Sequence, residues 1–170
     1  HLFFSEAIKP SGAPLVKNSM VLYDKNTVAL TSNLFLSPLS ILSLMSLIIV
    51  WLTYKDYKKN RQSHWLDTLL FFVTGSIGLL LILLWFATDH EATANNYNLL
   101  WAFVFNLLTL RQTRKIKPKR WFSRYLKFLL ILLSLLTLHW IVGVQVFAIT
   151  LLPLLVALAI RYVYLIYHFR

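Results

Sequence analysis

The feature that most constrains this chain is a stretch without a single charged side chain, from Phe128 to Ile160. As one straight helix it would be about 50 Å long, whereas the hydrocarbon layer of a bilayer is about 30 Å thick. We therefore expect two membrane spans, separated by a turn at Gly143-Val144-Gln145, where a glycine and an amide occur together. Pro153 would then lie inside the last span and is expected to kink it.

Three further apolar segments precede this stretch, so the predicted fold is an all-α integral membrane bundle of five transmembrane helices. Hydrophobic residues make up 58% of the chain and charged residues 14%, against about 25% charged in soluble domains. This composition argues against disorder and against a soluble α/β enzyme. Pro38 near the start of the first span is harmless, because the first turn of a helix needs no N–H there. The expected membrane domain is 34–170, with spans at about 34–52, 66–86, 97–110, 128–142 and 146–166.

Loop charges predict the orientation of these spans. Lys and Arg crowd the first loop and the third loop, which runs from Arg111 to Lys127, whereas the second loop has none and carries Asp89 and Glu91. By the positive-inside rule, we expect the N-terminus to face outward and the C-terminus, with Arg161 and Arg170, to be cytoplasmic. The net charge of +11 is thus explained by the topology, and no nucleic acid partner is expected. Trp and Tyr residues near both boundaries agree with these levels.

The segment 1–33 differs from the rest, with Pro10, Gly12 and Pro14 and a possible short strand at 19–23. We interpret it as an external tail or the end of a periplasmic domain. The chain begins at His1, and we expect it to be a piece of a longer protein. It contains no cysteine, which excludes a thiolate metal site or a cysteine nucleophile within these residues.

The most polar outward patch runs from Thr88 to Asn98, and we expect His139 to lie at a similar depth. A histidine can accept a proton near neutral pH and a carboxylate can orient it. The candidate catalytic residues are Asp89, His90 and His139. The candidates for binding a headgroup or substrate are Thr88, Asn95, Asn96, Asn98, Asn106, Trp85 and Trp101. The alternative interpretation is a wet loop whose polar residues cap helix ends.

Other polar features have structural interpretations beside functional ones. Asn106 serves either as a functional group or as an interhelical hydrogen bond. Gly75 and Gly78, three residues apart, are interpreted as a site of close helix packing. No convincing metal-ligand spacing or phosphate-binding glycine loop is present, so no metal or cofactor is expected.

Several runs resemble a known family. They are Ser37-Pro38-Leu39-Ser40, then Asp67 to Phe72 followed by Gly75, and the block from Leu84 through Thr88-Asp89-His90 to Asn98-Leu99-Leu100-Trp101-Ala102-Phe103. They are similar to the five-helix membrane domain of the Lnb-type bacterial lipoprotein N-acyltransferases. The resemblance covers about Pro38 to the C-terminus and implies a protein of the bacterial inner membrane, with an external domain before the helices. It further implies that an acyl chain is added to the N-terminal cysteine amine of a lipoprotein.

The missing cysteine is a departure, because the external domain of that family is thought to carry a catalytic thiol. This chain alone is expected to be inactive in that chemistry, and its polar patch would bind headgroups, position the acyl donor or dock the external domain. The alternative function is a non-catalytic membrane anchor or accessory subunit of a larger envelope complex. Membrane lipid, and a lipoprotein substrate or a larger membrane complex, are the expected partners. A small transporter is disfavoured, because the halves do not repeat and no charge pair is expected at mid-membrane.

Overall fold

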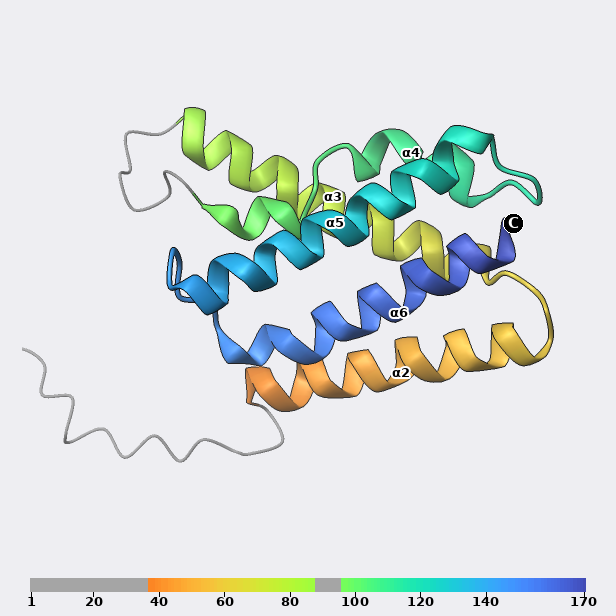
Figure 1. Cartoon of the computed structure of the whole chain (residues 1–170), viewed down its shortest axis with the longest axis horizontal. Coiled ribbons are helices and arrows are strands. Elements are labelled where there is room, and N and C mark those ends of the chain that lie inside the picture. Colours follow the sequence, from red (N-terminus) through yellow and green to blue (C-terminus); the bar gives the residue numbers. More distant parts are fainter. Residues whose placement is uncertain (1–36, 88–95) are drawn as a thin grey trace, which may run out of the picture. The chain divides into compact units, whose positions relative to one another are not determined.

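The computed structural model describes residues 37–87 and 96–170, which all belong to one compact unit, Leu34–Arg170 (Figure 1). The described residues form helices and turns and contain no strand, which confirms the predicted all-helical class. Predictions for residues 1–33, including the external tail and its strand, lie outside the described residues. The helices are α2 (Pro38–Lys58), α3 (His64–Phe86), α4 (Asn106–Thr113), α5 (Arg120–Val142) and α6 (Leu152–His168), with short 3-10 helices η3 (Tyr97–Leu100) and η4 (Ile149–Leu151).

Four helical segments in the described part of the chain are long and apolar enough to cross a bilayer. They are α2, α3, α5 and the combined η4–α6 segment, Ile149–His168. Between 17% and 39% of each apolar window is buried inside the structure, so most of this apolar surface faces outward. Such a surface suits a lipid environment, where outward apolar side chains carry no penalty. The chain is a multi-pass membrane protein.

The helices pack in a definite order. Helix α6 lies between α2 and α5, and α3 carries α4 on its side (Figure 1). Aromatic and leucine side chains fill the interior, with Phe71, Phe122 and Leu158 fully buried. Phe71 meets Phe122 and Tyr162 with ring centroids 5.8 Å apart in both pairs, so α3, α5 and α6 share one aromatic core.

Helix ends follow the local sequence in two places and depart from prediction in a third. Ser37 caps α2, accepting a hydrogen bond from the Ser40 N–H, and Pro38 takes the first turn. Gly143 ends α5 in the left-handed conformation, with φ of 79°, so the turn predicted there is confirmed. The predicted kink at Pro153 is wrong, because Pro153 lies in the first turn of α6, where a missing N–H breaks no helical bond.

The third predicted span, 97–110, is not one continuous helix. It consists of η3, an irregular stretch at 101–105, and α4. This irregular stretch fits closely against α3 because two glycines of α3, Gly75 and Gly78, have no side chain. A Cβ on Gly78 would collide with the Ala102 carbonyl, and one on Gly75 would lie 2.9 Å from the Leu107 N. The close-packing interpretation of both glycines is confirmed. Irregular backbone at membrane depth is tolerated where protein buries it, and Ala102 is fully buried here.

Candidate functional site

Amide side chains gather at the end of the bundle where α3 and α5 finish and α6 begins. We call Asn96, Asn98 and Gln145 the amide cluster. The Asn96 Oδ1 accepts hydrogen bonds from the Asn98 N–H at 3.0 Å and from Asn98 Nδ2 at 2.8 Å. The Tyr97 N–H donates to Gln145 Oε1 at 2.8 Å. This last bond ties η3 to the turn between α5 and α6.

Two of the predicted site residues border the amide cluster. Trp101 is buried, and its indole Nε1 donates to Asn98 Oδ1 at 2.9 Å. The His139 Nδ1 donates to the Leu135 carbonyl at 2.8 Å, and its ring centroid lies 4.8 Å from that of Tyr97. Because Nδ1 carries the proton in that bond, a neutral His139 has Nε2 as its acceptor. The structure thus brings Asn96, Asn98, Trp101 and His139 together.

The remaining predicted residues of this patch are not placed with that group. Trp85 is half-buried and stacks on Phe86, with ring centroids 5.2 Å apart. Thr88, Asp89, His90 and Asn95 lie outside the described residues. The pairing of a carboxylate with His90 or His139 therefore stays a prediction.

Asn106 lies away from the amide cluster and is fully buried. Its Nδ2 donates to Thr74 Oγ1 at 2.8 Å, and its Oδ1 accepts from the Tyr125 hydroxyl at 2.6 Å. One side chain thus links α3, α4 and α5. Both ends of the amide are engaged, which favours the interhelical hydrogen bond over a ligand-binding role.

A second polar group, which was not predicted above, lies at the opposite end of the helices. We call Asp56, Asp67 and Arg161 the charge cluster. The Arg161 Nε lies 2.7 Å from Asp67 Oδ1, and its Nη1 lies 2.9 Å from Asp56 Oδ2. All three side chains are at most 1% exposed. The sequence predicts Arg161 inside the last span and counts it among the cytoplasmic cations. In the structure its guanidinium is buried and joins α2, α3 and α6.

A signal for the charge cluster was present in the sequence. An ionisable residue inside an apolar helix almost always pairs with another one. Arg161 follows a long apolar run, and Asp56 and Asp67 flank the first loop. Positive-inside counting treats each cation separately, so it does not reveal that Arg161 pairs with Asp56 and Asp67. The ion pairs of the charge cluster lie toward one end of the helices, whereas the transporter hypothesis calls for a charge pair at mid-membrane.

Polar residues of the α2–α3 loop complete the charge cluster. Asp56 accepts hydrogen bonds from the Ser63 N–H at 2.9 Å and from its hydroxyl at 2.8 Å. Gln62 Nε2 donates to Asp67 Oδ2 at 2.8 Å. Within the part of the chain that the structure describes, Gln62 Oε1 and Arg161 Nη2 are the buried side-chain polar atoms without a hydrogen-bond partner. Each of the four carboxylate oxygens thus accepts at least one hydrogen bond, and such bonds make a buried ion pair tolerable.

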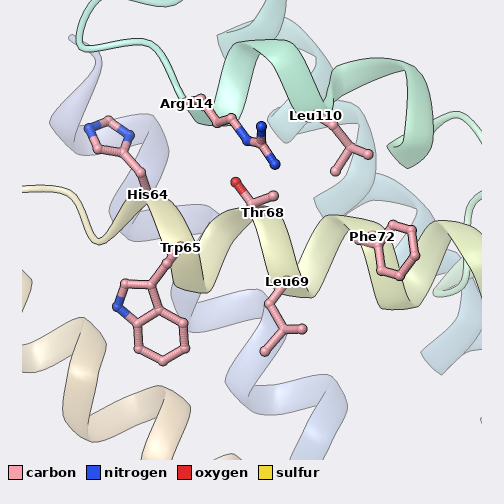
Figure 2. A pocket seen from close by; sticks show the side chains of 7 residues that line it. All are labelled: His64, Trp65, Thr68, Leu69, Phe72, Leu110 and Arg114. Carbon is pink, nitrogen blue, oxygen red and sulfur yellow. The ribbon is translucent and has the colours of Figure 1, made fainter.

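A hollow of about 610 Å³ opens beside the charge cluster, between α3 and α4 (Figure 2). Figure 2 shows the side chains of Arg114 and Thr68 pointing toward one another across it. The other lining residues are His64, Trp65, Leu69, Phe72 and Leu110. The hollow is mainly apolar, with its polar groups toward the start of α3.

The described residues offer no metal centre, since no group of three or more His, Cys, Asp or Glu side chains occurs among them. The acids in residues 37–87 and 96–170 are Asp56 and Asp67, and both are engaged by Arg161. Neither end therefore shows a complete nucleophile, base and oxyanion set within these residues.

Comparison with known proteins gives one result. A family model described as the Lnb transmembrane domain matches residues 30–170. A search of curated proteins and a search of solved structures found no match. The family match covers the charge cluster, the hollow and the amide cluster alike.

Proposed function

The chain belongs to the family of Lnb transmembrane domains, and we propose that it is the membrane-embedded part of a lipoprotein N-acyltransferase. In this proposal it helps to add an acyl chain to the N-terminal cysteine amine of lipoproteins. The observation that carries the proposal is the family match over residues 30–170. The family's chemistry is thought to use a catalytic thiol, and this chain has no cysteine. The nucleophile would therefore come from an external domain.

The amide cluster is the part of this chain that we assign to the reaction. Its side chains are half-buried rather than sealed, and it lies directly after the segment that contains Asp89 and His90. Amide and indole N–H groups can donate to ester carbonyls and phosphates, and His139 offers an Nε2 acceptor. We infer that this end binds the headgroup or the acyl donor, while Asp89 or Glu91 orients His90.

The orientation that fits this role places the amide cluster on the periplasmic side of a bacterial inner membrane. The supporting observation is the charge distribution. The loops at the charge-cluster end carry Lys and Arg, whereas the 88–96 segment has none. Cytoplasmic loops are enriched in Lys and Arg. Lipoprotein substrates would then meet the amide cluster at the outer leaflet.

Deletion and complementation of the gene in its own host test the proposal. Mass spectrometry of mature lipoproteins should show loss of the N-linked acyl chain in the deletion strain and its return with the full-length gene. His90→Ala and Asp89→Ala should each lower the acylated fraction at least tenfold, as removal of a general base does. His168→Ala, at the opposite end of the helices, is the matched control and should acylate normally.

Two results would count against the proposal in different ways. Unchanged N-acylation in the deletion strain would exclude the acyltransferase role. Normal acylation by His90→Ala and Asp89→Ala would keep the enzyme but make the patch structural. Immunoblots of each variant in the membrane fraction separate lost chemistry from lost protein.

A non-catalytic anchor or accessory subunit is the second candidate. It is favoured by the described residues having both acids tied up in a structural cluster and by the many exposed apolar side chains. Copurification in mild detergent distinguishes the two. A stable complex with an envelope protein, together with unchanged lipoprotein acylation on deletion, would favour the accessory role.

A further inference from the structure

Helix α3 has two different faces near its start. Asp67 faces inward and is consumed by Arg161 and Gln62. Thr68, the next residue, faces α4 and lines the hollow. The charge on the inward face is therefore neutralised by an ion pair. The lining of the hollow, by contrast, contains a cation and no acid.

The position of Arg114 at the hollow is fixed by its neighbour, Thr113. The Thr113 carbonyl accepts hydrogen bonds from His64 Nδ1 at 2.8 Å and from Gln62 Nε2 at 3.0 Å. The hydroxyls of Thr113 and Thr68 lie 3.1 Å apart. Three contacts thus hold the end of α4 against the start of α3, and Arg114 follows directly. Its placement is a property of the fold rather than of a free loop.

The charge of Arg114 has no counter-charge in the described part of the chain. Its guanidinium forms no hydrogen bond or ion pair there, and the acids of those residues, Asp56 and Asp67, are both engaged by Arg161. The flanking sequence adds further cations. They are Arg111, Lys115, Lys117, Lys119 and Arg120. A region this basic at a membrane boundary attracts anionic lipid headgroups.

The apolar part of the hollow continues from this charge along α3. Leu69 and Phe72 line it from α3 and Leu110 from α4, while Trp65 stands beside the polar end (Figure 2). Tryptophan favours the level where headgroup and acyl chain meet. From His64 to Phe72 the helix rises about 12 Å. The hollow thus has the polarity of one lipid molecule: a charged head, an interfacial ring and an apolar track.

We propose that the hollow between α3 and α4 binds one anionic membrane phospholipid. Its phosphate lies at Arg114 and Thr68, and one acyl chain runs along Leu69, Phe72 and Leu110. A guanidinium suits a phosphate because it donates two parallel N–H bonds. This site is distinct from the amide cluster and does not depend on the acyltransferase proposal. The lipid here holds α4 against α3 and is not a substrate.

Native mass spectrometry of the whole chain tests the site. The protein is released from detergent micelles doped with either phosphatidylglycerol or phosphatidylcholine. Phosphatidylglycerol should be retained as a single adduct, with about fivefold tighter binding than phosphatidylcholine, since each basic residue near the surface is worth roughly 1 kcal/mol toward anionic lipid. Arg114→Gln should remove this preference. Leu110→Trp, which fills the apolar track and leaves the charge, should reduce retention of both lipids.

Matched control variants distinguish binding in the hollow from attraction by diffuse surface charge. Lys115→Gln removes the neighbouring cation, which does not line the hollow, and should change retention less than twofold. Arg114→Lys should keep part of the preference. Equal losses in Arg114→Gln and Lys115→Gln would overturn the proposal, because diffuse surface charge would then suffice. Equal retention of the two lipids by the unaltered chain, or displacement of the adduct by inorganic phosphate, would overturn it too. Circular dichroism of each variant confirms that the helices are retained.

Discussion

The charge cluster and the amide cluster lie at opposite ends of the same helices and are built in opposite ways. The charge cluster joins α6 to α2 and α3, which lie far from it in the sequence, and its side chains are at most 1% exposed. The amide cluster uses neighbours in η3 plus one residue of a turn, and it is half-buried. A sealed, paired cluster fixes how helices pack, whereas a half-open cluster of donors can exchange its partners for a ligand. We therefore expect the charge cluster to hold the bundle together and the amide cluster to serve the proposed acyl transfer.

The largest expected effect comes from Arg161→Ala at the charge cluster. The change leaves Asp56 and Asp67 buried without their partner. Breaking a buried ion pair on one side costs about 3–5 kcal/mol, because the remaining charge stays desolvated. The free energy of unfolding, followed by circular dichroism in a reversible SDS titration, should fall by that amount. Arg124→Ala, which removes an exposed cation from α5, should change it by less than about 0.5 kcal/mol.

A compensated variant sharpens this prediction. Replacing Arg161 with Met and both acids with Asn removes all charge from the cluster at once. Stability should recover part of the loss, because neutral replacements of a buried ion pair are often tolerated. If Arg161→Ala unfolds no more easily than Arg124→Ala, the charge cluster does not hold the helices together and the division between the two ends fails.

A middle-sized effect is expected from Gly78→Ala, which tests the segment between the two ends. The added Cβ meets the backbone of Ala102 and Val104, which cannot move as a flexible side chain would. Overpacking of this kind costs about 1–3 kcal/mol. The same SDS titration measures it, and Leu79→Ala, at an exposed neighbouring position, is the control. A Gly78→Ala protein as stable as the unaltered chain would show that the 101–105 stretch moves away at no cost.

The sequence predicts much of the amide end but not the charge cluster, and the difference has a physical reason. The apolar segments, the Gly143 turn and the grouping of Asn96, Asn98 and His139 follow from local patterns and from depth in the bilayer. The pairing of Arg161 with Asp56 and Asp67 does not, because residues a hundred positions apart meet only through the packing of α2, α3 and α6. The break at 101–105 was missed for the same reason, since it depends on Gly78 of another helix.

Asn106 is an intermediate case, in which the sequence predicts a hydrogen bond but not its partners. The sequence alone marks Asn106 as significant, because a polar side chain within an apolar segment needs a partner. Its partners, Thr74 and Tyr125, came only with the structure. Polarity inside a span thus predicts that a bond exists, whereas helix packing decides with which residue.

The smallest expected effect on stability is at the amide cluster, in Gln145→Ala. It removes the acceptor of the Tyr97 N–H, a single half-buried hydrogen bond worth about 0.5–1.5 kcal/mol. Val144→Ala, an exposed change in the same turn, should be near neutral. Lipoprotein acylation in complemented cells should respond more strongly to Gln145→Ala than stability does, because η3, which follows the 88–95 segment in the sequence, loses its hydrogen bond to the α5–α6 turn. A variant that loses more than about 3 kcal/mol would contradict the comparison, since the amide end would then also hold the bundle together.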